Sequence, residues 1–524
     1  MRVKLLPGEE IRSPLMVLQF WRGDRLRAQN VWRRWMMAHA MPRPGGRLPP
    51  PQFVASSSRA YEEMIKADEQ NQIMHIDRYL EEGLKLDYWW MDAGWYIQQQ
   101  GWPQVGTWEV DPSRFPRGFR PISEHARARG VKILVWFEPE RVMPGTWLYE
   151  QHPEWLLNTS PGQQNPLAGM RSWSSSELGG TDPCVSYNPT DQTRTMANIQ
   201  WAPGRLSFHP GPQGEYGAVR WTAPEAGEYE VKSTFLAIDQ STTTAVYVLH
   251  GGEPVFSGWI NLQGLGRQAV YDGKLAVAKG DTLDFVVGWG NQTHVCGYLA
   301  YWDELRRRHP NMLIDSCASG GRRNDLETMR RSVPLWRSDY AYEPIGHQCM
   351  TYGISLWLPY HGTGTVASVA APYYGGGFTK VEPYAFWSNA APSLGSGIDI
   401  RVREIDYAAL RTLVGQWRQL SEFYYGDFYP LTPYTQDNRD WIAWQFNVSA
   451  RGEAAVQVFR RGESSSEECR LKLHALEPEA SYTITAFGSP ETSVATGRAL
   501  MAEGWNVVLP DKPSTGVIVF RRTK

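Results

Sequence analysis

Short apolar runs alternate with amphipathic stretches in two parts of the chain, residues 46–160 and 295–428. Alternating strand and helix patterns are typical of an α/β fold with a parallel sheet. Together the two parts hold about 250 residues, the usual size of a TIM barrel. The pattern therefore predicts a (β/α)8 TIM barrel. In its first part we expect strands at 53–57, 85–91 and 131–137 and helices at 61–83 and 122–129.

The remaining segments have a different pattern. Residues 161–294 are rich in Gly, Ser and Thr and hold short strand patterns without helices, which predicts an inserted β-sandwich of the jelly-roll type. Residues 429–524 also consist of strand patterns, and predict a C-terminal antiparallel β-domain. Residues 1–45 contain two short strands and a Trp/Arg-rich helix, which cannot bury a core by themselves. The predicted domains are thus 1–45, 46–160 (barrel), 161–294 (insertion), 295–428 (barrel) and 429–524.

Composition narrows the classes of function. The net charge of −2 argues against a nucleic-acid partner, and no apolar run approaches membrane-spanning length. With 24 Trp and 25 Tyr the chain is rich in aromatic residues, which favours carbohydrate binding, although aromatic residues also fill cores. The five cysteines have no metal or CxxC spacing, so neither a disulfide framework, a metal site nor another cofactor is indicated.

The strongest candidate site follows the apolar run at residues 313–316. Cys317, Gly320 and Gly321 come at its end, and Asp339 comes at the end of the next short apolar run, beside Trp336. Because parallel barrel strands open onto one catalytic face, these residues should line one pocket. Aromatic faces and carboxyls suit a sugar. The alternative for Asp339 is an N-cap of the following helix, and this stretch alone favours the cap.

Other polar residues fall at the ends of the earlier strands. Asp92 follows the second strand, Trp108 lies in the loop after it, and Glu138 and Arg141 follow the third strand. They are expected on the same face as Asp339. For Glu138 and Arg141 the alternative is a mutual ion pair beneath the pocket.

Five motifs in order resemble those of the α-galactosidases of glycoside hydrolase family 36, which are melibiase-like. They are Asp92-Ala93-Gly94-Trp95, Trp136-Phe137-Glu138-Pro139-Glu140, Leu148-Tyr149-Glu150-Gln151-His152-Pro153-Glu154-Trp155, Cys317-Ala318-Ser319-Gly320-Gly321-Arg322 and Trp336-Arg337-Ser338-Asp339. The resemblance implies an N-terminal β-supersandwich, a catalytic barrel and a C-terminal β-domain. Residues 1–45 then resemble only the tail of the supersandwich, so the N-terminus looks truncated. The compartment, whether cytoplasmic, periplasmic or secreted, stays open because a truncated start would hide a signal.

The resemblance also implies roles for particular residues. Asp339 corresponds to the general acid/base of a retaining α-galactosidase, and Asp92 to one of two acids that hold the sugar, although Ala93 stands where many members have the second. The other substrate-binding residues expected are Trp95, Trp108, Arg141, Cys317, Gly320 and Trp336. The implied partner is an oligosaccharide or polysaccharide with α-galactosyl ends. Family members often form homo-oligomers, partly through the domain mostly absent here.

The nucleophile has no visible counterpart. In the family it is an Asp at the end of the fourth barrel strand, in a Lys-Trp-Asp or Arg-x-Asp motif, and here the inserted β-sandwich fills that interval. Its acids read as turn or sandwich residues: Asp182, Asp191, Asp239, Asp281 and Asp284. Two functional hypotheses follow, an α-galactosidase and a catalytically inactive glycan-binding or assembly protein. A rearranged reading frame is a third alternative.

Overall fold

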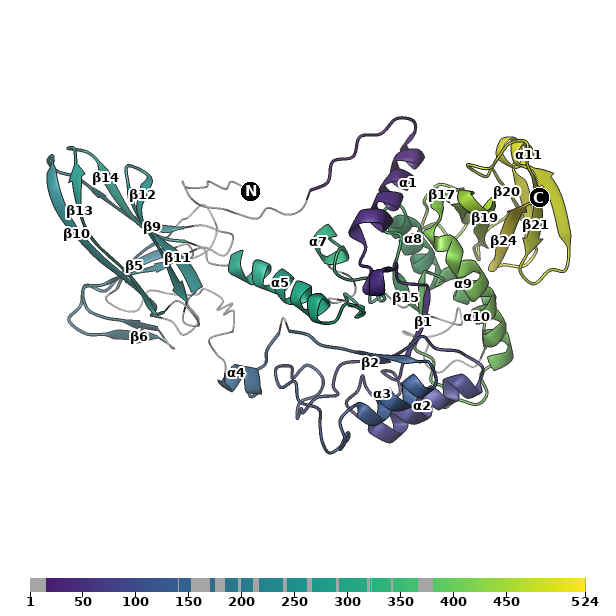
Figure 1. Cartoon of the computed structure of the whole chain (residues 1–524), viewed down its shortest axis with the longest axis horizontal. Helices are drawn as coiled ribbons and strands as arrows, with labels where there is room; N and C mark the ends of the chain where they lie inside the picture. The colour runs from purple at the N-terminus through teal and green to yellow at the C-terminus, as the bar shows by residue number, and fades with distance from the viewer. Residues whose placement is uncertain are drawn as a thin grey trace. The chain divides into compact units, whose positions relative to one another are not determined.

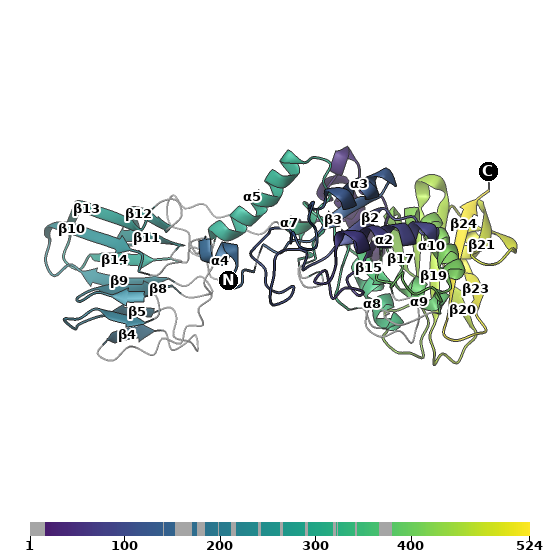
Figure 2. The same cartoon turned by 90° about the horizontal axis from the view of Figure 1, so that it is seen from below.

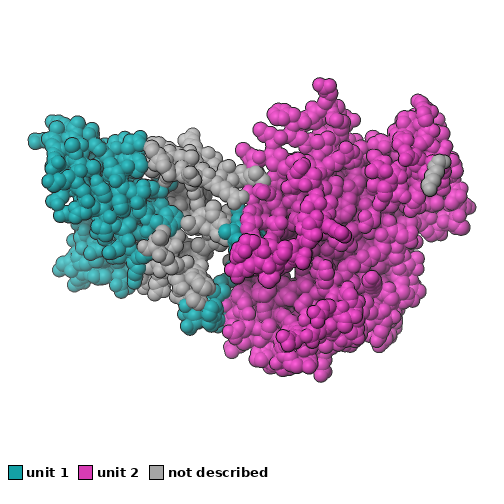
Figure 3. All heavy atoms as spheres, viewed as in Figure 1, with its two compact units in different colours: residues 1–14, 139–302 teal, residues 15–138, 303–524 magenta. Residues whose placement is uncertain are grey.

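The structure of the chain is a computed structural model. It describes residues 16–523 apart from 140, 152–169, 175–183, 197–198, 211–215, 239–242, 262–265, 289–291, 318–320, 322, 341–342 and 366–379. The chain divides into two compact units, residues 1–14 with 139–302 and residues 15–138 with 303–524 (Figure 3). Each unit is described by itself below.

A five-stranded parallel sheet forms the centre of the second unit (Figure 1). Its order is β15 (Gly362–Thr365), β16 (Ser393–Ser396), β1 (Gln52–Ser56), β2 (Tyr88–Met91) and β3 (Lys132–Val135). The last of these strands in the sequence, β16, thus pairs with the first, β1, which is how a barrel closes. Two short segments extend the ladder beyond β15: Arg337 N donates to Gly362 O (3.1 Å), and Asp315 forms a parallel bridge with Val333.

The two faces of these strands bury different clusters. Phe53, Trp89 and Met91 belong to a large cluster that includes residues of the surrounding helices. Val54 and Trp90 alternate with them and pack in a second cluster with Leu335, inside the curve of the sheet. This alternation has the period of two expected of a strand. Asp92, two residues after Trp90, continues the inner face.

Helices cover the outer face of the sheet, and α2 and α3 lie side by side (Figures 1 and 2). A predicted helix over 61–83 is too long, because Asp68 caps α2 and reciprocates with Asn71 in a capping box, so that residues 57–66 form turns instead. The helices associated with the sheet are α2 (Glu69–Glu81), α3 (Arg120–Ala128), α7 (Leu326–Met329), α8 (Pro344–Ser355), α9 (Pro383–Ser388) and α10 (Tyr407–Ser421).

Helix α1 (Arg25–Trp35), which the π-helical turn η1 (Met36–Ala40) continues, is anchored by one buried arginine. The Arg33 side chain donates to the carbonyl oxygens of Ser355, Tyr424 and Gly426 at 2.5, 2.8 and 3.1 Å. Burial lowers the pKa of Arg33 to about 10. Since these carbonyls would otherwise be buried without donors, Arg33 fixes this helix on the second unit.

The first unit contains the inserted strands. A four-stranded sheet, β12 (Glu253–Asn261), β11 (Thr243–His250), β14 (Thr282–Val287) and β9 (Gly217–Thr222), packs on the pair β10 (Gly227–Leu236) and β13 (Gln268–Val277). Phe235, Val246 and Val248 lie in the core between them, so this part is a β-sandwich. Smaller elements are β4 (Arg171–Ser174), β5 (Cys184–Tyr187), β6 (Arg194–Met196), β7 (Ile199–Trp201), β8 (Leu206–His209), α4 (Trp147–Gln151) and α5 (Gln292–Arg308), which runs into the second unit.

A six-stranded antiparallel sheet ends the chain, in the order β17 (Asp427–Pro430), β18 (Ile442–Val448), β19 (Glu453–Arg460), β24 (Ser514–Arg522), β21 (Ser481–Ala486) and β22 (Thr492–Thr496). It encloses a core of its own with the pair β20 (Glu468–Leu471) and β23 (Trp505–Val508) and helix α11 (Gly497–Ala502). The described strands therefore match the predicted fold class: a parallel α/β barrel sheet, an inserted β-sandwich and a C-terminal antiparallel domain.

Candidate active site

Three aspartates lie in or directly after neighbouring segments of the parallel sheet. Asp92 follows β2, Asp315 lies in the segment bridged to Val333, and Asp339 follows the segment that pairs with β15. Asp92 is held in place, because the Ser58 hydroxyl donates to Oδ2 and the Ala93 N–H donates to Oδ1, both at 2.8 Å. Asp315 accepts a hydrogen bond from Leu335 N at 2.8 Å.

Glu63 is a fourth acid of this site that the sequence pattern did not reveal. Its carboxyl is hydrogen-bonded to Asp92 and to the hydroxyl of Ser58. The loop that carries it folds back on the end of β2, because Met64 N donates to Ala93 O at 2.7 Å and Glu63 N donates to Ser58 O at 2.8 Å. The sequence pattern predicts a helix at this position, whereas α2 begins only at Glu69. The capping pair at Asp68 and Asn71 was the one local signal that a loop precedes the helix.

The electrostatics of these acids favour protons on the cluster. Loss of solvation, followed by the charge and the hydrogen bond of Asp92, raises the pKa of Glu63 to about 8. Loss of solvation also raises the pKa of Asp92, and raises the pKa of Asp315 to about 7. At neutral pH Glu63 is therefore mostly a neutral carboxylic acid, able to donate a hydrogen bond to Asp92.

Asp339 does not cap the next helix. Helix α8 is capped by Glu343, whose carboxylate accepts from Ile345 N and Gly346 N at 2.6 and 2.7 Å. The carboxylate of Asp339 is exposed and accepts a hydrogen bond from the Trp336 indole N–H at 2.9 Å. The capping alternative is thus wrong, and this acid remains open to a ligand. Trp336 packs edge to face on Trp90, with ring centroids 6.0 Å apart.

Trp95 and Trp108 belong to an aromatic cluster after β2. Trp95 is only 1% exposed, and its N–H donates to Trp136 O at 2.8 Å. Trp108 is half-buried against Trp95 and Phe137, with ring centroids 6.1 and 5.4 Å apart. In this structure Trp95 packs in the core behind the site, whereas Trp108 retains an exposed part.

The other residues expected at the site are less closely placed. Cys317 is partly buried, and Gly320 lies outside the described residues. Gly321 has a φ of 81°, and a Cβ there would lie 2.0 Å from Arg337 O, so the backbone accepts only glycine at this point. Arg141 is exposed and belongs to the first unit, whereas Glu138 belongs to the second.

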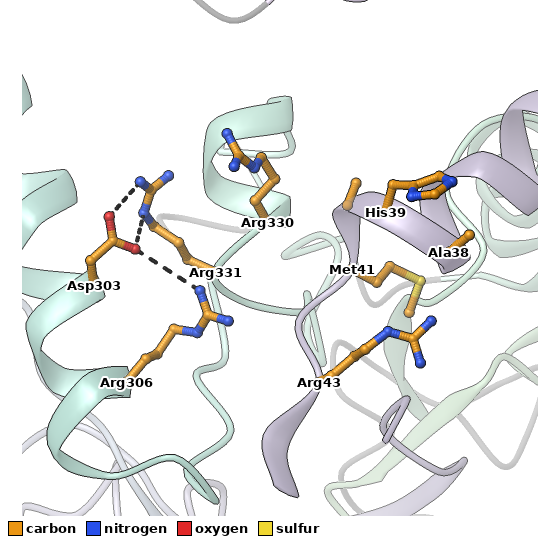
Figure 4. Close-up of a pocket in the computed structure, with 9 residues that line it drawn as sticks. Ala38, His39, Met41, Arg43, Asp303, Arg306, Arg330 and Arg331 are labelled. Atoms are coloured by element: carbon orange, nitrogen blue, oxygen red, sulfur yellow. Dashed lines mark hydrogen bonds and ion pairs between the residues drawn. The ribbon is translucent and has the colours of Figure 1, made fainter. Parts of the chain in front are cut away.

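A basic cleft of about 370 Å³ lies at the opposite end of the strands (Figure 4). Its lining includes Arg43, Arg306, Arg330 and Arg331, and Asp303 accepts two hydrogen bonds from Arg331 at 2.6 and 2.9 Å. These residues precede the strand segments at 313–316 and 333–337, whereas the acids follow strands. Barrel enzymes place catalysis where strands end, so the cleft is not part of the acidic site.

The strand order has a gap at the fourth barrel strand, between β3 and the segment at 313–316, among the described residues. Within the described ranges no parallel strand lies between them, which is the place of the fourth strand in an eight-stranded barrel. Two acids of the inserted region have other roles: Asp284 pairs with Arg220 on neighbouring sandwich strands, and Asp281 accepts from Ala278 N in a turn. Both sit as predicted for sandwich or turn residues.

The two findings below concern the described part of the chain. No three His, Cys, Asp or Glu side chains there are grouped as ligands for a metal ion. None of the described helices has the length and apolar character needed to span a bilayer.

Sequence comparison gives two family matches. Residues 61–171 and 290–379 match Melibiase, and residues 441–519 match the glycosyl hydrolase family 36 C-terminal domain. Curated relatives include alpha-galactosidase 2 of Pediococcus pentosaceus, 22% identical over 83% of this chain and 51% of the relative. Another is alpha-galactosidase AgaA of Geobacillus stearothermophilus, 22% identical over 87% of this chain and 52% of the relative. The chain spans about half the length of these relatives.

Solved structures support the same fold. Alpha-galactosidase AgaB of Geobacillus stearothermophilus aligns with a TM-score of 0.59 at 17% identity, over 95% of this chain and 59% of that one. A variant of AgaA in complex with raffinose aligns with a TM-score of 0.60 at 17% identity, over the same shares of the two chains. These neighbours confirm the predicted TIM barrel with a C-terminal β-domain.

Proposed function

Since this chain belongs to glycoside hydrolase family 36, we propose that it binds terminal α-galactosyl groups at the acidic strand ends and hydrolyses them with retention of configuration. The observation that carries the proposal is the meeting of Asp92, Asp315 and Asp339 with Trp336 at one end of the parallel sheet. Related enzymes support the substrate class, because variants of AgaA are known in complex with raffinose and with stachyose.

In this proposal Asp339 is the general acid/base. Its carboxyl is exposed, and the Trp336 indole N–H fixes one oxygen, which leaves the other free to give a proton to the leaving oxygen. Asp92 accepts hydrogen bonds from sugar hydroxyls, while Trp108 offers an apolar wall. Roles for Cys317, Gly320 and Arg141 in lining the substrate, and for Trp95 behind it, rest on the motif resemblance.

A second function is favoured by one specific observation. Retention requires a nucleophilic carboxylate about 5 to 5.5 Å from the acid/base. Among the described residues, the barrel position that would supply it, between β3 and the segment at 313–316, holds no strand. Without a nucleophile the same site would bind α-galactosides and turn them over slowly or not at all. An inactive glycan-binding protein is therefore the alternative proposal.

The test is hydrolysis of an aryl α-galactoside by the unaltered chain and by Asp339→Ala, each with and without azide. If the chain has its own nucleophile, the unaltered protein releases galactose with the α configuration, and azide leaves the rate unchanged. In Asp339→Ala, azide then attacks the anomeric carbon of the galactosyl-enzyme on the face that the phenol left, opposite the bond to the enzyme carboxylate. That bond breaks, and the product is α-galactosyl azide.

If no nucleophile exists, azide takes its place in the unaltered chain. It attacks the anomeric carbon as the phenolate leaves, and the product is β-galactosyl azide, formed only when azide is added. This result would establish the inactive binder. Absence of both galactose binding and phenol release, in a protein shown to be folded, would contradict both proposals.

A further inference from the structure

Resting on the proposed function, we propose that Glu63 is a sugar-binding residue of this site: it forms a carboxyl pair with Asp92 and supplies the second acid that Ala93 cannot. The side chain of Ala93 has no polar atom and is 3% exposed, so it adds no acceptor beside Asp92. Glu63 is hydrogen-bonded to Asp92, from a loop that precedes α2.

The backbone places Glu63 over the end of β2. One hydrogen bond joins the loop to the strand end directly, from Met64 N to Ala93 O at 2.7 Å. The Arg114 side chain makes a second link, and its Nη2 donates to Gly94 O at 2.8 Å on the strand-end side. Arg114 also donates from Nη1 to Ala67 O at 3.1 Å, which joins the loop to the same arginine. Contacts of the residues that follow Glu63 thereby hold its carboxyl beside Asp92.

The backbone of Glu62 and Glu63 has φ values of 50° and 59°. These lie in the left-handed region, which residues other than Gly, Asn and Asp rarely adopt. The hydrogen bonds described above hold the loop in this conformation.

An independent observation points to a ligand at the same place. Trp90 is 9% exposed, and its indole N–H has no hydrogen-bond partner among the described residues. It lies two residues before Asp92 on the inner face of β2, and packs on Trp336, which holds Asp339. Burying a donor without a partner is unfavourable, and a ligand hydroxyl or a water on this side of the site would relieve it.

The groups that act on Glu63 come from three elements. Asp92 at the end of β2 and Asp339 after the strand segment disfavour its charge, and a hydrogen bond with the Ser58 hydroxyl of its own loop favours it. At neutral pH Glu63 is protonated and donates to Asp92. The pair then shares the proton of Glu63 and offers acceptor oxygens from both residues, an arrangement suited to adjacent hydroxyls of a neutral sugar.

The chemistry also predicts what the pair rejects. A uronic acid would bring its carboxylate to a cluster that already carries the charges of Asp92 and Asp339, and like charges at close range are unfavourable. We therefore expect neutral galactosides to bind and galacturonosides to be excluded.

The experiment measures galactose binding by ligand-observed NMR from pH 6 to pH 9.5, with galacturonate as the anionic probe. The variants are Glu63→Gln, Glu63→Ala and Glu62→Gln. Glu62 is the matched control, because it has the same left-handed backbone and the same charge, but its side chain is 61% exposed and pairs with Lys66. The unaltered chain should lose affinity as the pH passes about 8, since Glu63 then ionises.

The variants should separate in a definite way. Glu63→Ala should weaken galactose binding at pH 7 by tenfold or more. Glu63→Gln keeps an N–H that can donate to Asp92, so it should retain most of the affinity and lose the fall above pH 8. Glu62→Gln should behave as the unaltered chain does. Galacturonate should not bind to any of them.

Two results would overturn the inference. If the unaltered chain binds galactose and Glu63→Ala binds it equally well, Glu63 is not a sugar-binding residue and the proposed function stands. If the affinity of Glu63→Gln falls above pH 8 as steeply as that of the unaltered chain, the carboxyl pair does not control binding. If the unaltered chain binds no galactose, the proposed function itself fails, and with it the inference.

Discussion

Replacing Glu63 with glutamine should change how the stability of the fold depends on pH. The carboxyl has an ordinary pKa of 4.5 and a pKa of about 8 in the folded chain, so folding takes up a proton between these values. The folded state then binds more protons than the unfolded state, and stability must fall as the pH rises through this window. The substitution removes that proton and should flatten the dependence.

The size of the effect is bounded by one proton. A single titrating group changes the free energy of unfolding by at most about 1.4 kcal/mol per pH unit, which gives at most about 4 kcal/mol between pH 5 and pH 8. Glu63 is only partly buried, so the measured effect should be smaller than this bound. Relative to the unaltered chain, Glu63→Gln should therefore become progressively more stable from pH 5 to pH 8.

The assay is urea unfolding followed by tryptophan fluorescence at several pH values. Asp315, with its pKa raised to about 7, contributes a slope of the same sign, but it is present in every variant and cancels in the difference. Glu62→Gln is again the control and should keep the slope of the unaltered chain. Equal slopes for the unaltered chain and Glu63→Gln would refute the reasoning, and so would a flattened slope in Glu62→Gln.

Two further substitutions test the framework around the site. Arg33→Met should lower the free energy of unfolding by about 3 kcal/mol in urea titrations, because three carbonyl oxygens lose a buried donor. The control is Arg27→Met on the exposed face of the same helix, which should change the free energy of unfolding by less than about 0.5 kcal/mol. Gly321→Ala should abolish galactose binding as measured by NMR, because the new Cβ would lie 2.0 Å from Arg337 O, two residues before Asp339; unchanged binding would show that this turn does not shape the site.

Apolar runs predicted the strands of the barrel well. The run at 53–57 overlaps β1, and the runs at 85–91 and 131–137 contain β2 and β3, because a parallel strand buried on both faces is apolar throughout. The acids after these strands could be placed on one face for the same reason. The start of α2 was predicted too early, since apolar spacing continued into a loop that only the capping pair at Asp68 marks.

Glu63 could not be predicted, because its environment depends on contacts distant in sequence. A glutamate in a polar stretch is normally solvated, and nothing local shows that Met64 and Arg114 hold its loop against residues 93 and 94. The N-cap alternative for Asp339 failed for a similar reason. Glu343 also lies before the proline of α8, and only the structure shows which acid accepts the N–H groups.

The protonation of Glu63 bears on whether this site can turn a substrate over. The family resemblance implies a nucleophile on the fourth strand and a second acid where Ala93 stands. The described residues supply neither at those positions, and they offer one additional carboxyl beside Asp92, that of Glu63. A neutral carboxylic acid is a poor nucleophile, so at pH 7 Glu63 can bind sugar but cannot replace the missing group. If Glu63 were the nucleophile, hydrolysis would appear only as the pH rises through about 8 and would vanish in Glu63→Gln. Because the same ionisation weakens sugar binding, affinity and turnover would then change in opposite directions with pH, and a single pH series on both would distinguish a binding residue from a nucleophile.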